Sequence, residues 1–518
     1  MTFEIVFVLL SLLGMVAALI ADKMRPGMIL FSVVVLFLCA GILTPKEMLE
    51  GFSNKGMITV ALLFLVSEGI RQSGTLGQVI KKLLPQGKTT VFKAQLRILP
   101  SVAFISAFLN NTPVVVIFAP IIKHWAKSVN LPATKFLIPL SYVTILGGIC
   151  TLIGTSTNLV VHGMILEAGF EGFSMFELGK VGIFIAIAGI IYIFLFSKRL
   201  LPDARPDTAV PDEEVEEGEK LHRVEAVLGA RFPGINKKLK DFNFQRHYGA
   251  EVKEIKTRNG QRFVSNLEEV VLHEGDTLVV MADDTFIPTW GESSVFVLLT
   301  NGNEPDTTGK KKKRWFALLL LVLMIVGATV GELPITKEMF PDIKLDMFFF
   351  VSITTIIMAW TNLFPARKYT KYISWDILIT IACAFAISKA MVNSGVADSV
   401  AKFIIGLSDD YGPHVLLAMV FIITNLFTEL ITNNAAAALA FPLALSISAQ
   451  LGVSPTPFFV VICMAASASF STPIGYQTNL IVQGIGNYKF TDFVRIGLPL
   501  NIIAFLISIF LIPLIWPF

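Results

Sequence analysis

The motif Asn110-Asn111-Thr112-Pro113 interrupts an apolar segment that runs over residues 94–122. A second apolar segment, residues 414–448, carries Thr432-Asn433-Asn434 at the corresponding place. Pro113 removes a backbone donor and restricts the residue before it, so a regular helix is not expected to continue through the motif. Irregular backbone and polar side chains at membrane depth are costly unless they lie inside protein or beside a cavity. The two breaks therefore predict a polar site within a membrane protein.

The composition is that of a membrane protein. Hydrophobic residues make up 54% of the 518 residues and charged residues only 16%, whereas soluble domains carry about 25% charged residues. Several apolar segments approach the roughly 20 residues that a helix needs to cross a bilayer. The first, residues 3–20, is followed by Asp22-Lys23-Met24-Arg25 instead of a small-residue cleavage site. We therefore expect a retained span rather than a signal peptide.

The two halves of the chain repeat each other. The sequence from Gly154 to Leu159 aligns with the sequence from Gly475 to Leu480 at an offset of 321, and Ser73-Gly74 aligns with Ser394-Gly395 at the same offset. Asn111 and Asn433 align at an offset of 322. Matches in the same order at a nearly constant offset predict two structural repeats, residues 1–200 and 314–518.

The order of the apolar segments predicts that the second repeat is inverted. If segments 94–122 and 414–448 are re-entrant hairpins, each half crosses the membrane five times, and an odd number of crossings reverses the second half. Basic residues then gather on one side, which the positive-inside rule makes cytoplasmic. We predict a multi-pass protein of the plasma (inner) membrane with both termini outside. The basic residues are Lys23, Arg25, Arg71, Lys81, Lys82, Lys123, Lys127, Lys198, Arg199, Lys310 to Arg314, Arg367, Lys368 and Lys371.

A polar insertion, residues 201–313, separates the halves. An acidic run at 212–217 is typical of a solvated linker. Strand-forming stretches follow at 223–228, 250–256 and 277–281. The predicted fold is an all-α polytopic membrane protein of two inverted repeats, with re-entrant hairpins, broken helices and a small α/β domain in the cytoplasm.

The breaks also indicate what the site accepts. Helices that restart after a break point free N–H groups and positive dipole ends at it, which favours an anion. Helix C-termini and side-chain carbonyls favour a hard cation such as sodium. Asn and Thr also hold membrane helices together without binding a ligand, so the motifs alone leave both interpretations open.

Paired hairpin-tip motifs, each followed about 45 residues later by a broken helix ending in Asn, resemble the divalent-anion/sodium symporter family of the ion-transporter superfamily. The resemblance covers both membrane halves, roughly 400 residues. The family has Ser-Asn-Thr at the tips, whereas this chain has Asn110-Asn111-Thr112 and Thr432-Asn433-Asn434. It keeps the middle Asn and changes the neighbours.

The resemblance implies two sodium sites that combine hairpin side chains with the backbone of a broken helix. Ser106 and Thr428 each precede their motif by four residues, so one helical turn places them beneath it. The implied residues are Ser106, Asn110, Asn111 and the backbone near Gly154 for the first site, and Thr428, Thr432, Asn433 and the backbone near Gly475 for the second.

The resemblance also implies that a small divalent anion lies between the hairpin tips. Broken helices of the family usually carry Thr-Pro-Pro, whereas this chain has Thr155-Ser156-Thr157 and Tyr476-Gln477-Thr478. The anion contacts therefore depart from the family pattern. The residues implied are Asn111, Thr112, Thr155, Asn433, Asn434 and Tyr476.

A finer resemblance concerns the branch of the family. Gly-Tyr-Gln-Thr-Asn at 475–479, preceded by Ser471-Thr472-Pro473, looks like the sulfate-transporter-like branch. Members of that branch commonly carry TrkA-C domains between the halves, and residues 221–290 resemble one copy through 234–239, 248–252 and 272–278. Such domains dimerise or bind small ligands in other proteins. The family resemblance further implies a homodimer with elevator-type movement.

These points give one prediction and leave alternatives open. We predict a sodium-coupled symporter of sulfate or a similar divalent anion, working by alternating access. A dicarboxylate is the second candidate substrate. A sodium/proton antiporter or arsenite-type carrier is more distant, and Glu429 and His162 would matter most there. The sequence has no P-loop, paired carboxylates or nucleophile elbow, so neither ATP-driven transport nor an enzyme is expected, and nucleic-acid binding is not expected either.

Overall fold

The structure is a computed structural model that describes residues 3–21, 24–203, 221–229, 232–257, 261–283, 286–290, 295–300, 311–340, 342–407 and 412–518. The acidic run predicted as a linker, 212–217, lies outside the described residues, as do Lys23 and Lys310.

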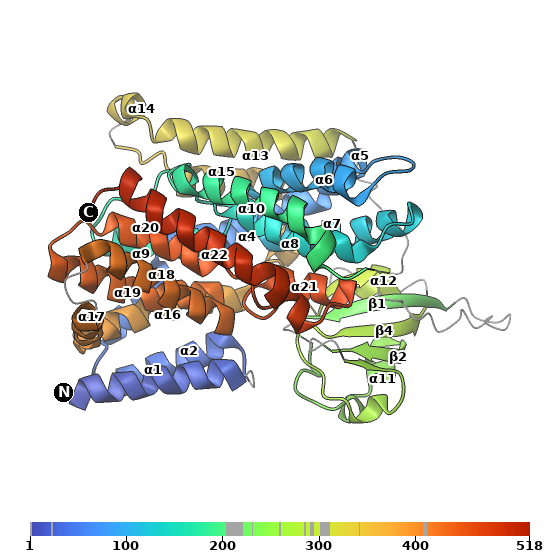
Figure 1. Cartoon of the computed structure of the whole chain (residues 1–518), viewed down its shortest axis with the longest axis horizontal. Helices are drawn as coiled ribbons and strands as arrows, with labels where there is room; N and C mark the ends of the chain where they lie inside the picture. The colour runs from blue at the N-terminus through green and yellow to red at the C-terminus, as the bar shows by residue number, and fades with distance from the viewer. Residues whose placement is uncertain are drawn as a thin grey trace.

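Helices make up both membrane halves, which lie side by side in one body (Figure 1). The first half contains α1 (Phe3–Ala21), α2 (Pro26–Cys39), α3 (Pro45–Glu50), α4 (Lys55–Gln72), α5 (Thr75–Leu83), α6 (Val91–Ser106), α7 (Asn111–Ser128), α8 (Leu137–Gly148), α9 (Ser156–Glu167) and α10 (Gly179–Leu200). The second half contains α13 (Lys311–Gly331), α14 (Pro334–Met339), α15 (Met347–Trp360), α16 (Trp375–Asn393), α17 (Val396–Leu407), α18 (Gly412–Leu430), α19 (Asn433–Leu451), α20 (Thr456–Ser467), α21 (Gln477–Gly486) and α22 (Phe490–Ile515).

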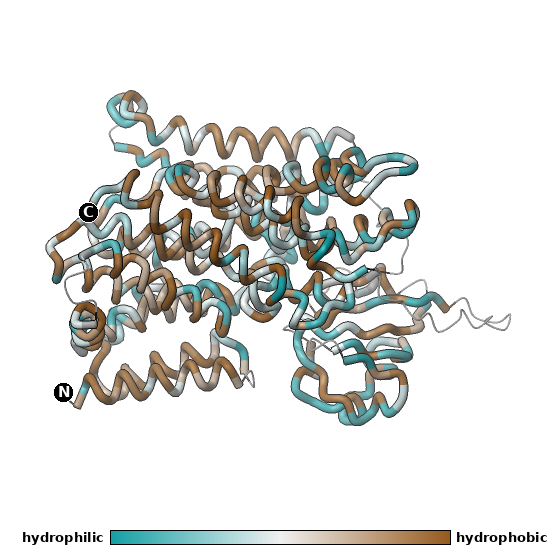
Figure 2. Tube along the Cα trace, viewed as in Figure 1, coloured by the Kyte–Doolittle hydropathy of each residue, from teal (hydrophilic) through white to brown (hydrophobic). Residues whose placement is uncertain are grey.

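The helices have the length and surface of membrane spans. Among the described residues, eight helices are long and apolar enough to cross a membrane. Hydrophobic residues run along the helices, and hydrophilic ones gather at their ends and in the insertion (Figure 2). Large apolar side chains such as Phe104 and Leu514, 70% and 78% exposed, are placed where lipid replaces water. The prediction of a multi-pass membrane protein is confirmed.

The two repeats are visible element by element. The helix order α4 to α10 matches the order α16 to α22, with breaks at the same places. Gly74 and Gly395, which align at the predicted offset, both have left-handed backbone, with φ of 72° and 75°. Each ends the turn between a long helix and the short helix that follows, a conformation that glycine adopts without a steric penalty.

The pair α6 and α7 forms a hairpin whose outer ends lie together. The Arg97 guanidinium in α6 donates to the Lys82 carbonyl at 2.9 Å, and the Trp125 indole in α7 donates to the Pro85 carbonyl at 2.9 Å. Both helices thus contact the last turn of α5 or the stretch just after it. The tip, residues 107–110, lies at the other end of the pair.

The pair α18 and α19 opens toward the opposite end of the molecule. His414 at the start of α18 and Phe458, soon after α19 ends, both contact the Phe518 ring, with centroid distances of 5.1 and 5.7 Å. In Figure 1 both termini lie at the end of the molecule away from the sheet of the insertion. The two hairpins therefore enter from opposite ends, as expected for inverted repeats.

The insertion domain, by which we mean the described part of residues 221–300, is built on an antiparallel five-stranded sheet of order β3-β2-β4-β1-β5. Aromatic residues fill its core, among them Phe232, Phe244, Tyr248 and Phe296. The fifth strand lies beyond 290, the end of the predicted core. The elements are β1 (His222–Leu228), α11 (Phe244–Tyr248), β2 (Glu251–Lys256), β3 (Arg262–Phe263), β4 (Thr277–Ala282), α12 (Phe286–Trp290) and β5 (Phe296–Thr300).

Candidate functional site

Four helices begin at one place between the repeats. They are α7 and α19, which follow the hairpin tips, and α9 and α21, which follow the breaks in the broken helices. The Tyr476 hydroxyl, just before α21, lies 2.7 Å from Asn111 Nδ2 at the start of α7 and 2.9 Å from Thr155 Oγ1 just before α9. The side chain of Asn433, at the start of α19, approaches the same hydroxyl. One tyrosine thus joins all four helix starts.

Two further contacts cross between the repeats. Ser156 Oγ donates to Asn434 Oδ1 at 3.1 Å, and Thr112 Oγ1 donates to Gln477 Oε1 at 3.4 Å. The repeat offsets pair Ser156 with Gln477 and Thr112 with Asn434, so the internal symmetry relates the two contacts to each other. Each hairpin tip therefore contacts the broken helix of the other repeat, a relation that the sequence does not reveal.

The N-termini of these four helices lack side-chain caps. Over the residues that the structure describes, the N-cap residues of α7, α9, α19 and α21 make no side-chain capping bond. Within α19, the Asn434 N–H donates to Asn433 Oδ1 at 3.0 Å. By contrast, Thr44, Asn54, Thr90 and Asp346 cap α3, α4, α6 and α15. Uncapped N–H groups and the positive ends of helix dipoles favour negative charge. The convergence of four such ends can hold an anion.

The first predicted cation site comes together around Asn111. Ser106 and Asn111 are both fully buried, and Ser106 Oγ donates to Asn111 Oδ1 at 2.7 Å. Gly148 lies against this side chain, and Gly154 lies against Gly148. A Cβ added at Gly148 would come within 2.7 Å of Asn111 Oδ1, and one added at Gly154 within 2.5 Å of the Gly148 carbonyl oxygen. Glycine permits this close approach of backbone oxygens.

The second predicted cation site has a different arrangement. Thr428 Oγ1 donates to the Ala466 carbonyl at 2.7 Å instead of facing Asn433. The Thr428 carbonyl oxygen lies against Gly475, where an added Cβ would be 2.3 Å away. Thr432 Oγ1 is buried and has no hydrogen-bond partner among the described residues. Thr428 and Gly475 are therefore adjacent, and Thr432 offers a free oxygen.

The Ser106 hydroxyl bonds Asn111, whereas Asn110 faces a cavity. It lines a cavity between α4 and the first hairpin tip together with Ser67 and Ser156. The remaining lining residues are apolar and come from α4, the hairpin tip, the break before α9, α9 itself, and α13. As the residue before α7, Asn110 faces this cavity from the edge of the anion site.

Each broken helix is clamped by an asparagine in the same way. Asn158 Nδ2 donates to the Thr151 carbonyl at 2.9 Å, and Asn479 Nδ2 donates to the Thr472 carbonyl at 3.1 Å. Asn158 Nδ2 also donates to the Gly148 carbonyl at 3.5 Å, and Asn479 Nδ2 also donates to the Ser469 carbonyl at 2.9 Å. The irregular backbone is therefore held by equivalent bonds in both repeats, as burial in an apolar medium requires.

Two threonines tie the broken helices to the hairpins. Thr151 Oγ1 donates to the Ala107 carbonyl at the first tip, and Thr472 Oγ1 donates to the Glu429 carbonyl beside the second at 3.0 Å. Neither threonine was among the predicted site residues. Their positions differ by the repeat offset of 321, so the alignment of the halves contained the signal that would have found them.

Glu429 has a fixed and a free carboxylate oxygen. Its Oε1 accepts from the Ser471 backbone N–H at 2.9 Å and from Asn501 Nδ2 at 2.7 Å. Its Oε2 is buried and has no partner among the described residues. Ala107 stands at the equivalent place of the first repeat, so only the second site carries a carboxylate.

His162 lies in α9 and packs against Gly172. A Cβ added at Gly172 would come within 2.4 Å of the His162 ring, so the glycine leaves space for the imidazole. This tight fit favours a packing role for His162.

The described residues contain no group of three or more His, Cys, Asp or Glu side chains that could hold a metal ion. A cation at either site would instead meet hydroxyl, amide and carbonyl oxygens, which suit sodium in unwound membrane helices.

A model of the citrate transporter family (CitMHS) matches residues 16–446 and 343–517 of this chain. This chain belongs to the citrate transporter family. The match confirms the predicted membership of the ion-transporter superfamily and identifies a transporter. The TrkA-C character of the insertion stays a prediction.

Two relatives align with nearly the whole of this chain, and a third aligns with about half of it. An uncharacterized transporter of Synechocystis is 30% identical over 569 residues, covering 93% of this chain and 92% of the relative. Uncharacterized transporter YfbS of Escherichia coli is 25% identical and covers 99% of this chain and all of its own length. Sodium/sulfate cotransporter 1 of Chlamydomonas reinhardtii is 33% identical over 298 residues, 55% of this chain and 32% of the relative.

Proposed function

We propose that this citrate-transporter family member carries a small divalent anion, sulfate in the first place, across the membrane together with sodium. The convergence of four helix N-termini whose N-cap residues make no capping bond, joined by Tyr476, is the observation that carries the proposal. Such a site concentrates positive potential without a Lys or Arg side chain. A charged anion can therefore be bound and released again without breaking a strong ion pair.

The coupling ions would occupy the two hairpin sites. Ser106, Asn111 and the backbone near Gly154 supply oxygens in the first site, and Thr428, Thr432 and the backbone near Gly475 supply them in the second. Asn110 and Asn433 would complete the two sets. Both sites lie beside the anion site, so bound sodium would lower the cost of bringing negative charge into the membrane. This linkage would make anion binding depend on sodium.

Sulfate is favoured over a dicarboxylate by the names of relatives in Chlamydomonas reinhardtii and by the Gly475 to Asn479 motif. The contacts of the anion would come from Asn111, Thr112, Thr155, Asn433, Asn434 and Tyr476. A dicarboxylate remains the second candidate because the matching family is described as a citrate transporter family.

The cycle would be alternating access by an elevator-type movement in a homodimer. The hairpins and broken helices of both repeats would form the moving unit, because their contacts with one another cross between the repeats. The insertion domain would face the cytoplasm. Basic residues Lys123, Lys198 and Arg199 lie at the same end of the molecule as the insertion domain, which supports this orientation.

The proposal is tested by uptake of radiolabelled sulfate into proteoliposomes, with and without an inward sodium gradient. Sodium-driven sulfate uptake that excess succinate and citrate do not inhibit supports the proposal in full. Sodium-driven succinate uptake without sulfate uptake would replace the substrate and keep the sites. Anion uptake that is equal with sodium and with potassium would refute sodium coupling.

A further inference from the structure

The insertion domain contacts the two helices that carry opposite sides of the anion site. Its contacts reach α7, which begins at Asn111, and α21, which begins after Tyr476. These two helices belong to different repeats and are joined at their starts by the Asn111–Tyr476 hydrogen bond.

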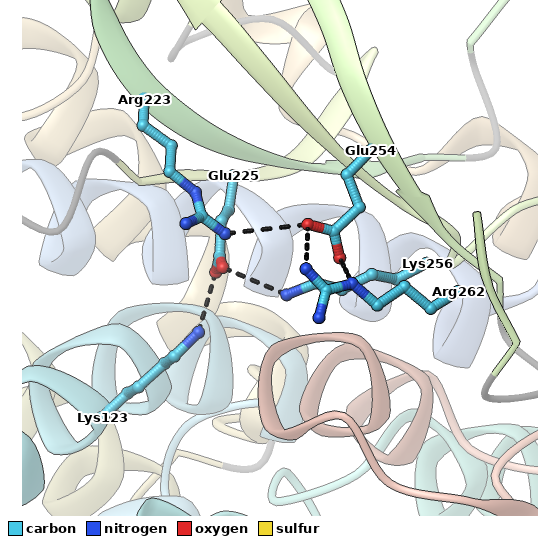
Figure 3. Close-up of polar contacts among 6 residues, drawn as sticks. All are labelled: Lys123, Arg223, Glu225, Glu254, Lys256 and Arg262. Carbon is cyan, nitrogen blue, oxygen red and sulfur yellow. Dashed lines mark hydrogen bonds and ion pairs between the residues drawn. The ribbon is translucent and has the colours of Figure 1, made fainter. Parts of the chain in front are cut away.

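An ion-pair network holds the domain to α7 (Figure 3). Lys123 Nζ of α7 lies 2.9 Å from Glu225 Oε2 of β1, and Lys256 Nζ of β2 lies 3.4 Å from the other oxygen of Glu225. The side chains of Glu225 and Lys256 are only 14% and 4% exposed. In the pair that joins the domain to α7, the side chains of Lys123 and Glu225 are 24% and 14% exposed. Removing either partner would leave a largely buried charge without its counter-charge, which is destabilising.

A second network lies beside the first. Glu254 of β2 pairs with Arg262 at 2.5 Å and approaches Arg223 at 3.9 Å. The Glu254 side chain is 2% exposed. These ion pairs fix β1, β2 and β3 relative to one another, so the strand that contacts α7 is part of a rigid sheet.

Glycine allows a close contact between the domain and α21. A Cβ added at Gly484 would lie 2.5 Å from Thr277 Oγ1 of β4, and one added at Gly275 would touch the Leu480 side chain at 3.4 Å. Tyr476, Leu480 and Gly484 are spaced by four residues, so they follow one face of α21 from the anion site to the insertion domain. Val227 of β1 adds an apolar contact to the core of the membrane half.

We propose that the insertion domain is a fixed part of the moving transport unit, clamped to α7 and α21, and that it holds the starts of these helices in register. The claim that the domain moves rests on the proposed transport function. The claim that the domain is clamped to α7 and α21 does not. Residues Lys123, Glu225 and Gly484 are positioning residues, because they act on the anion site only through the two helices.

The glycine contact provides a test that does not depend on transport. Gly484→Ala should loosen the clamp although alanine is the better helix former. Amide hydrogen exchange of β1 and β4 in the full-length protein in lipid nanodiscs should become about tenfold faster, which corresponds to about 1.4 kcal/mol. Thr277→Ala alone should leave exchange unchanged, because Thr277 Oγ1 has no hydrogen-bond partner among the described residues.

The double variant makes the test specific. Thr277→Ala removes the atom that obstructs the new methyl group, and the next neighbour of that group, the Gly275 carbonyl oxygen, is 3.4 Å away. Exchange in Gly484→Ala/Thr277→Ala should therefore return to the wild-type rate. Gly406→Ala in α17 is the matched control, since nothing lies within 4 Å of an added Cβ there. Unchanged exchange in Gly484→Ala, or no rescue in the double variant, would overturn the clamp.

Movement of the domain with the transport unit is tested by cross-linking. Lys123→Cys/Glu225→Cys is joined with a reducible bis-maleimide, and sodium-driven uptake is compared before cross-linking, after it and after reduction. Single-cysteine variants treated with the same reagent control for modification of the native cysteines. We expect uptake to stay within about twofold. Uptake that is lost on cross-linking and restored by reduction would show that the domain separates from α7 during the cycle.

The two tests separate the clamp from the transport function. If the unmodified protein takes up neither sulfate nor succinate with sodium, the proposed function fails, and the exchange measurements still decide the clamp. If uptake is present and cross-linking blocks it, the fixed clamp fails and the proposed function stands.

Discussion

The two hairpin sites share a scaffold and differ in the groups placed on it. In both repeats an asparagine clamps the broken helix, and a threonine ties that helix to the hairpin. In the first site Ser106 bonds Asn111, whereas in the second Thr428 turns to the Ala466 carbonyl. The second site also has a carboxylate where the first has an alanine. The repeats are thus symmetric where buried backbone groups need hydrogen bonds, and they differ at the residues proposed to bind ligands.

The difference has a physical reason. Unpaired backbone groups are equally costly in both repeats because both breaks lie in an apolar medium. The side chains at the proposed ligand sites are under no such backbone constraint, so the two repeats can differ there. Tyr476 shows this, since Thr155 at the equivalent position is too short to reach across the site.

The largest expected effect is loss of coupled uptake in Asn111→Ala and in Asn433→Ala. Asn111 bonds both Ser106 and Tyr476, and both asparagines are assigned to cation and anion at once. We expect sodium-driven uptake at background level with normal membrane insertion. Asn130→Gly, at an exposed left-handed position after α7, should transport normally. Normal uptake in either alanine variant would break the site assignment.

The shared scaffold predicts equal effects of Asn158→Ala and Asn479→Ala. Each substitution leaves buried carbonyls unpaired, at a cost of about 1–3 kcal/mol, so uptake should fall by at least roughly fivefold. Initial rates at saturating sodium measure this effect. A large effect in one repeat and none in the other would mean that the equivalent hydrogen bonds do not contribute equally to the structure that transports.

Tyr476→Phe tests the asymmetric contact across the site. Removing the hydroxyl deletes the bonds to Asn111 and Thr155 and keeps the ring. Each bond contributes about 1 kcal/mol, so the loss of both should raise the KM for the anion roughly thirtyfold with a smaller change in maximal rate. Tyr192→Phe, which loses a bond to the Ile496 carbonyl, is the matched control. An equal change in both variants would indicate a general packing effect.

Glu429→Gln tests the charge that only the second site carries. The amide keeps the shape of the carboxylate and removes its charge next to Thr428. We expect the half-saturating sodium concentration to rise about threefold, less than 1 kcal/mol, while anion affinity at saturating sodium is retained. Sodium dependence identical to that of wild type would assign Glu429 to structure alone.

The smallest effect concerns pH and the insertion domain. Burial raises the pKa of Glu225, but Lys123 and Lys256 more than compensate and lower the pKa to about 2. A carboxylate with a lowered pKa stabilises the folded state above its ordinary pKa of about 4.5 and loses this contribution as pH falls toward 2. Exchange of β1 should therefore be insensitive to protonation of Glu225 between pH 5 and 8, after correction for the intrinsic pH dependence of exchange. A stability change centred near pH 6 would contradict the ion pair.

Much of the architecture followed from pattern alone. Segment length and composition predicted the spans, and the offset of 321 predicted the repeats, because span length and helix breaks are local properties of the chain. The three strand-forming stretches of the insertion are strands β1, β2 and β4. The strand β5 was missed, since its pairing with β1 is long-range and its residues lie past the predicted boundary.

The sequence by itself determined the class of protein, the two repeats and the asparagine motifs, because hydrophobicity and helix-breaking residues act locally. The tertiary structure decided which side chains meet. Only the fold brings Tyr476 to Asn111, 365 positions away. It also directs the Thr428 hydroxyl to the Ala466 carbonyl instead of to Asn433. In the same way it places Lys123 against Glu225. These contacts depend on how the two inverted repeats pack against each other. The spacing of residues along the chain does not indicate which residues of one repeat approach the other.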